Sequence, residues 1–426
     1  MKTSDPDRSQ LTLPRGFPLV LALSMGAGPL TLQTLTATAP LVTADLGITR
    51  AQLGSLPTAA FLTAALLSPV VGRGADLFSG RAVLAVLFSG AGLALLGTAA
   101  APSYAWLLAA AAVSGAAQAM SNPVTNQLIA ANVAPGLRGR LTGIKQSGVQ
   151  MSQFAAGLVL PSVALLLGWR GAAAAAAVAT VTGLLLVRGS VPAGSAEPLP
   201  ASGGGREALP SAVGWLAAYA FITGAAIQAT NVYLPLYSFE RLHMPVQTAG
   251  LTVAVAGGVG LVARIAWGRA AERVVRPGRP LLALATASVL ASFSILAADR
   301  LHAPVLVWVG AALFGAGGLA SNVVLMLALM RATPLRGVGT ASGILAVGLY
   351  LGFALGPLGY GLVVDHTGSY GIGWLTVVGV NVAAAALAVV GGPFLRRSGR
   401  RDPPEGPAPR LHGLPSPDVR QEGRPC

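Results

Sequence analysis

Residues 82–101 read AVLAVLFSGAGLALLGTAAA, a run of 20 positions without a single charge. A helix of about 20 apolar residues spans the hydrocarbon core of a bilayer. Similar runs recur along nearly the whole chain, whose mean hydropathy is +0.68 and whose charged residues make up only 10%. They are too long for barrel strands, and lipid requires internally bonded backbone, so we predict an all-α integral membrane protein.

Twelve segments have the length and composition of transmembrane helices. Only four of the 28 lysines and arginines, Arg50, Arg170, Arg241 and Arg300, lie in the predicted loops on one side of the membrane. Most of the others lie in the loops and tails on the opposite side, which must be the cytoplasmic side because basic residues concentrate in cytoplasmic loops. We therefore expect a multi-pass protein of the bacterial inner (plasma) membrane with both termini cytoplasmic, and we assign the net charge of +14 to topology and anionic lipid rather than to nucleic acid. The predicted helices are residues 17–44, 50–72, 82–101, 104–133, 141–167, 169–188, 211–238, 246–272, 280–298, 303–332, 337–362 and 370–396.

A Pro-, Gly- and Ser-rich segment at residues 189–210 divides these helices into six and six. SGAAQAMSN at 114–122 is matched by FGAGGLASN at 314–322, which suggests a duplicated unit whose copies run parallel. We predict a cytoplasmic N-terminal tail (1–16), a first six-helix bundle (17–188), a cytoplasmic linker (189–210), a second bundle (211–396) and a disordered cytoplasmic C-terminal tail (397–426).

Two loops at corresponding places carry related motifs, GRGADLFSGR at 72–81 and GRAAERVVRPGR at 268–279. Each places an acid one helical turn after a glycine, so a neighbouring helix can approach the glycine while the carboxylate meets basic groups. Such clusters can stabilise one closed state of a moving protein. We therefore predict a conformational gate formed by Gly72, Asp76, Arg81, Gly268, Arg269, Glu272 and Arg273.

These loops resemble the signature of the major facilitator superfamily between its second and third helices. Gly168-Trp169-Arg170 and GPLGYGLVVDHTGSYGIGW at 356–374 also resemble recurrent segments of that family. The resemblance covers about residues 17–396. It implies the twelve-helix major facilitator fold of two six-helix parallel repeats, and transport by alternating access.

The interior of the predicted bundle is polar in one place, GIKQSGVQMSQF at 143–154. All 14 acids and all four histidines lie in predicted loops, tails or helix ends, which leaves Lys145 as the conspicuous charge at depth. Gln146, Gln150 and Gln153 share one stripe of the same helix, and lipid-facing helices do not carry such stripes. The alternative is a lysine that reaches back to the membrane surface from a lipid-facing position.

Further amides lie on other predicted helices, and each is also explained as a bond between helices. In the family that this chain resembles, the first, fourth, seventh and tenth helices line the central cavity. We therefore expect a substrate site that combines residues of the fourth, fifth, seventh and tenth segments: Gln118, Asn122, Asn126, Lys145, Gln146, Gln150, Gln228, Asn231 and Asn322.

These observations predict a secondary active transporter that moves a small organic solute, anionic or zwitterionic, by alternating access. The alternative is an exporter of multiple drugs or neutral compounds from the same superfamily. No nucleophile, metal site or acid pair is expected at depth, so we predict neither an enzyme nor a cofactor. The expected partners are the lipid bilayer and a small-molecule substrate but no nucleic acid; we expect a monomer, and coupling to a proton, to sodium or to no ion stays open.

Overall fold

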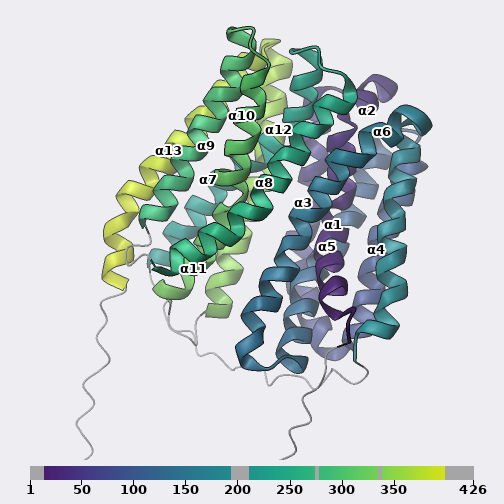
Figure 1. The fold of residues 1–426 in the computed structure, drawn as a ribbon, viewed down its shortest axis with the longest axis vertical. Helices are drawn as coiled ribbons and strands as arrows, with labels where there is room; N and C mark the ends of the chain where they lie inside the picture. Colours follow the sequence, from purple (N-terminus) through teal and green to yellow (C-terminus); the bar gives the residue numbers. More distant parts are fainter. Residues whose placement is uncertain (1–13, 193–210, 274–277, 334–337, 399–426) are drawn as a thin grey trace, which may run out of the picture.

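The computed structural model describes residues 14–192, 211–273, 278–333 and 338–398, and every regular element within them is helical. Figure 1 shows these helices side by side as one bundle. They are α1 (Phe17–Ala37), α2 (Ala39–Leu46), α3 (Arg50–Leu77), α4 (Gly80–Ala99), α5 (Tyr104–Asn132), α6 (Pro135–Ser190), α7 (Ser211–Glu240), α8 (Val246–Arg273), α9 (Gly278–Arg300), α10 (Val305–Phe314), the π-helical turn η1 (Gly315–Leu319), α11 (Ser321–Ala332), α12 (Val338–Thr367) and α13 (Tyr370–Ser398).

Ten of the described helical segments are long and apolar enough to cross a membrane. One of the ten, in α6, holds two predicted spans because the helix breaks at Gly168, where φ is 74° and ψ is 166°. Helix α5 is not among the ten, and its second half carries the amides of Gln118, Asn122 and Asn126. The prediction of an all-α membrane protein with the major facilitator fold is confirmed.

Two predicted helices are not continuous. The segment predicted at 17–44 divides at Thr38, because Pro40 in the first turn of α2 has no N–H to continue the helical bonding. The segment predicted at 303–332 widens into η1 at its GAGGL sequence, where three glycines relax the helical bonding. Apolar composition does not register either irregularity, because both occur inside long hydrophobic runs.

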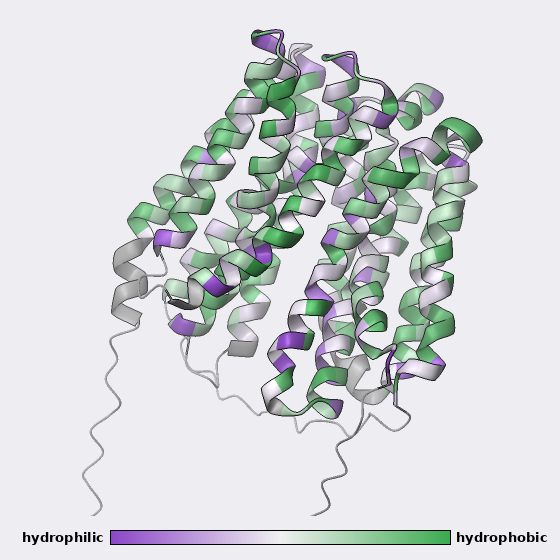
Figure 2. Ribbon diagram, in the orientation of Figure 1, coloured by the Kyte–Doolittle hydropathy of each residue, from purple (hydrophilic) through white to green (hydrophobic). Residues whose placement is uncertain are grey.

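Successive membrane-spanning segments alternate in direction, so the connections between them gather at two ends. We call the end where α3 joins α4 and α8 joins α9 the terminal end, since α1 begins and α13 ends there (Figure 1). The opposite end, with the connections at residues 46–50, 240–246 and 367–370, is the distal end. Figure 2 shows mostly apolar ribbon between the two ends, as a lipid environment requires.

The Gly168 break forms a corner at the distal end. Trp169 is buried, and its Nε1 donates to Asp45 Oδ2 at 3.1 Å. Arg170 donates Nη1 to the same oxygen at 2.7 Å and holds the Ala101 carbonyl with Nε and Nη2. The hydrogen bond from Arg170 lowers the pKa of Asp45, so the carboxylate stays charged and joins α2 to α6.

The two halves of the chain meet at the distal end through α3 and α12. The hydroxyl of Tyr233 on α7 donates to the carbonyls of Arg50 and Pro357. Arg50 forms a salt bridge with Glu240 at 2.7 Å. Asp365 accepts from the backbone N–H of Arg50 at 3.2 Å and of Ala51 at 2.8 Å, so a residue of the second half caps the first turn of α3.

We expect Asp365→Ala to lower the apparent melting temperature of the purified protein. The change leaves two N–H groups of α3 without their acceptor, a loss of about 1 kcal/mol for a capping carboxylate. His366→Ala is the matched control, because His366 is the next residue and is exposed. Equal melting temperatures for the two variants would show that the cap contributes nothing to the closed distal end.

Candidate functional site

Lys145 is buried inside the protein, with 1% of its surface exposed. Its Nζ reaches across to α5, where it donates to Thr125 Oγ1 at 2.9 Å, to Asn126 Oδ1 and, at 3.4 Å, to Asn122 Oδ1. This placement contradicts the lipid-facing alternative, because a surface anchor would point to the membrane interface. The α5 residues lie one turn apart, which brings their oxygens to the same face of the helix.

The partners of Lys145 are all neutral. No acidic residue occurs in the sequence between Asp76 and Glu197, so α4, α5 and α6 supply none. The ion pairs that the described residues form are at the distal end and join Arg50 to Glu240, Arg170 to Asp45 and Arg241 to Asp299. A buried ammonium held by amide and hydroxyl oxygens has no opposite charge to compensate it, which is energetically costly.

Two amides of α5 hold this ammonium, and further amides lie along α5 and α6. Gln146 donates Nε2 to Asn122 Oδ1 at 3.4 Å, so Lys145 and Gln146 share that oxygen. The Tyr350 hydroxyl of α12 lies beside the Asn122 side chain. Among the described residues, the buried Oε1 atoms of Gln118 and Gln150 have no hydrogen-bond partner, which leaves two acceptors free to bind a donor.

The other predicted site residues divide into those that join this group and those that do not. Gln153 is buried and donates to Asn231 of α7 at 2.9 Å, which connects the two halves further along α6. Gln228 is buried in α7 and Asn322 is exposed on α11, and within the described ranges neither makes a hydrogen bond to the Lys145 group. Lys145, Gln146, Asn122 and Asn126 therefore form the centre of the candidate site.

Arg264 is a second cation at depth that the sequence interpretation missed. It lies on α8, donates Nε to the Leu319 carbonyl at 3.0 Å and donates Nη1 to the Gln146 carbonyl at 3.2 Å. Its position in the sequence could have indicated this depth. Arg264 precedes the end of the predicted 246–272 helix by eight residues, which is about 12 Å along the helix axis.

Helices α6 and α8 carry the cations from opposite halves. They pack closely at Gly157, where a Cβ would lie 2.6 Å from the Ala254 nitrogen, and they diverge toward the terminal end (Figure 1). The Arg264 contact to Gln146 is nearer the terminal end than the Gly157 contact. The two cations therefore lie where the halves begin to separate.

The predicted gate falls largely outside the described side chains. Gly72 and Asp76 lie in the last turns of α3, and Glu272 and Arg273 end α8, but their side chains are not among those described. Of the remaining gate residues, Arg81 donates Nε to the Val191 carbonyl at 2.7 Å, Arg269 is exposed, and a Cβ at Gly268 would meet Val323 at 3.6 Å. The gate stays a prediction.

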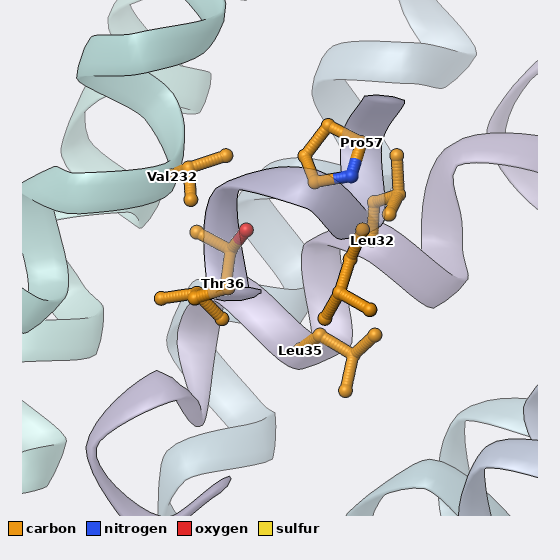
Figure 3. Close-up of a pocket in the computed structure, with 7 residues that line it drawn as sticks. Leu32, Leu35, Thr36, Pro57 and Val232 are labelled. Atoms are coloured by element: carbon orange, nitrogen blue, oxygen red, sulfur yellow. The ribbon is translucent and has the colours of Figure 1, made fainter. Parts of the chain in front are cut away.

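An apolar void lies between α1, α3 and α7 on the distal side of the polar group. Figure 3 shows Leu32, Leu35, Thr36, Pro57 and Val232 around it. Its volume is about 10 Å³, which is room for one water molecule and not for a solute. Within the described ranges no three His, Cys, Asp or Glu side chains come together as a metal site would require.

The sequence model of the Major Facilitator Superfamily matches residues 21–357. The chain therefore belongs to this superfamily, and it is a multi-pass membrane protein with a transporter fold. A comparison with curated proteins finds no match.

Solved structures share the fold at low sequence identity. A bacterial homologue of the human lysosomal transporter Spinster, in an inward-facing and unoccupied conformation, is 17% identical with a TM-score of 0.69, over 93% of this chain and 98% of that one. A mutant of the nucleoside transporter NupG is 14% identical with a TM-score of 0.72, over 88% and 99%. A D-xylose–proton symporter is 15% identical with a TM-score of 0.72, over 87% and 97%.

Proposed function

We propose that this protein is a secondary active transporter that moves a small organic anion or zwitterion across the bacterial cytoplasmic membrane by alternating access. The terminal end faces the cytoplasm, in accord with the distribution of basic residues. The substrate enters between the halves and binds at Lys145, Asn122, Asn126 and Gln146. The halves then move about this site, opening the distal end and closing the terminal end.

One observation carries this proposal: Lys145 is buried, and its hydrogen-bond partners are neutral. A carboxylate brought by a substrate would compensate the ammonium, so it would be bound more strongly than a neutral or cationic solute. The amides of Asn122, Asn126 and Gln146 offer both donors and acceptors to the rest of the solute.

The contacts of the two ends support the same mechanism. At the distal end the halves are joined by Asp365, Tyr233 and the pair of Arg50 with Glu240, and these contacts are polar and small enough to be broken and remade. At the terminal end α6 and α8 diverge (Figure 1). A carrier closed at one end and separating at the other is one of the two states that alternating access requires.

We expect small carboxylates or amino acids to raise the melting temperature of the purified protein, and sugars and cationic or neutral drugs to leave it unchanged. Ligands that bind the folded state stabilise it by mass action. Lys145→Ala is expected to weaken this binding by about 30-fold or more, because it removes a desolvated charge from the pair. A thermal-shift titration of both proteins measures the effect.

Arg140→Gln is the matched control, since it also removes a cation from α6 but at an exposed position nearer the terminal end. It should bind anions as the unaltered protein does. Stabilisation by lipophilic drugs alone, unchanged in Lys145→Ala, would reject the anion site and favour the drug-exporter alternative.

A further inference from the structure

Arg264 resembles Lys145 in its partners. In the contacts that the described residues make, only neutral oxygen atoms accept hydrogen bonds from it. The Leu319 and Gln146 carbonyls accept from it, and no ion pair of the described ranges includes it. Main-chain carbonyls stabilise a guanidinium less than a carboxylate does, because a carboxylate matches its fork with two charge-assisted bonds. The site therefore contains two cations whose charges nothing in the described interior compensates.

A continuous polar chain joins the two cations. Arg264 contacts the carbonyl of Gln146, the side chain of Gln146 contacts Asn122, and Asn122 contacts Lys145. Lys145 extends from α6 toward α5 of the first half, whereas Arg264 extends from α8 of the second half. The cations thus approach one region from two sides and belong to the two bodies that move against each other.

We propose that Arg264 is a second substrate-binding residue and that the cargo is a small organic dicarboxylate, with one carboxylate at Lys145 and the other at Arg264. This inference rests on the proposed anion site. A single carboxylate would leave one cation uncompensated, and a compact anion such as phosphate would not present separated charges to groups bound on different helices. Two carboxylates on a short carbon chain compensate both and draw the halves together.

A substrate carboxylate can displace the two carbonyls that now accept hydrogen bonds from Arg264. The Leu319 carbonyl ends the π turn η1, and the Gln146 carbonyl is part of α6, so neither depends on Arg264 to remain folded. A carboxylate that displaces these carbonyls gains two charge-assisted bonds in exchange for two neutral ones. The substrate therefore competes on favourable terms with the contacts that hold Arg264 in its absence.

The test compares each dicarboxylate from malonate to adipate with its own half-amide, a monoanion of the same length. In thermal-shift titrations the best dicarboxylate should bind the unaltered protein at least about tenfold more tightly than its half-amide. In Arg264→Gln the two should bind equally, within about twofold, while the half-amide keeps the affinity it has for the unaltered protein. Lys145→Gln should lose both.

The variants separate the two proposals. A dicarboxylate preference that persists in Arg264→Gln, or equal binding of dicarboxylates and half-amides to the unaltered protein, overturns the role of Arg264 and leaves the anion site standing. Absence of any shift by carboxylates of either kind overturns both. If Arg264→Gln does not yield folded protein, Arg264→Lys replaces it; it keeps the charge but not the fork and should bind dicarboxylates more weakly than arginine does. Arg140→Gln, on the exposed part of α6, should keep the full preference.

Discussion

Replacing Gly148 with leucine is expected to leave no correctly folded protein. Gly148 lies where α6 crosses α1, and a Cβ placed on it would be 1.9 Å from the Ala22 carbonyl oxygen and 2.7 Å from its carbon. On the other side of the same seam, a Cβ at Gly26 would lie 2.8 Å from the Gly148 oxygen. Small residues let two transmembrane helices approach at the backbone, so a side chain there must push the helices apart.

Because backbone rather than a flexible side chain fills the space, we expect a loss of more than about 4 kcal/mol in folding free energy. Size-exclusion chromatography of the detergent-purified variant checks this as loss of the monodisperse peak. Gly143→Leu is the matched control on α6, since a Cβ there has no atom within 4 Å. A Gly148→Leu protein that elutes and melts as Gly143→Leu does would refute the close crossing of α1 and α6.

Gly54→Leu is expected to fold but to lose closure of the distal end. A Cβ on Gly54 of α3 would lie 2.3 Å from the Pro357 oxygen and 2.5 Å from the Tyr233 hydroxyl, and both of these residues belong to the second half. The substitution therefore disturbs contacts between the halves and leaves the core of each half intact. A cost of about 2 kcal/mol to the closed form shifts the balance of states about 30-fold toward an open distal end.

Cysteine labelling measures that shift without knowledge of the substrate. Thr58 donates its hydroxyl to the Ala354 carbonyl across the same interface, so Thr58→Cys in a Cys426→Ser background reports on closure. A membrane-impermeant maleimide should label it slowly in the closed protein and at least about tenfold faster with Gly54→Leu. Gly359→Leu on α12, where a Cβ has no atom within 4 Å, is the control and should label slowly. Equal rates in all three proteins would mean that α3 and α12 do not close the distal end.

Composition and hydropathy were enough to predict an all-α membrane protein, because lipid leaves the backbone few choices. The major facilitator fold was predicted from the resemblance of the loop motifs at 72–81 and 268–279 to the signature of that family. The break at Gly168 was also predicted, since glycine interrupts an apolar run there. The division at Thr38 and the π turn at 315–319 were not, because both lie within runs that are apolar throughout. Hydropathy measures depth in the membrane and does not register how each turn of a helix is bonded.

The candidate site was predicted in part. The helical spacing of Asn122 and Asn126, together with the polarity around Lys145, indicated a shared polar region, and the structure joins these three residues. Arg264 was missed because other arginines follow it at short intervals toward the end of α8. The rule that basic residues concentrate in cytoplasmic loops explains all of these arginines equally well, so it does not single out Arg264. Gln228 and Asn322 were included because they are polar and because the family resemblance places the seventh and tenth helices around the cavity. Neither argument gives the direction in which a helix turns such a residue.

The lack of an acidic partner for both cations among the described residues has an electrical consequence. Lys145 and Arg264 are two formal positive charges, and no ion pair of the described residues neutralises them. A membrane potential acts on each unit charge with up to about 2.3 kcal/mol per 100 mV crossed. With the terminal end in the cytoplasm, as proposed, an inside-negative potential holds the empty carrier's charges toward the cytoplasm and slows their return. A bound dicarboxylate cancels both charges. The membrane potential should therefore change the rate at which the empty carrier reorients and leave the rate at which the loaded carrier reorients unchanged.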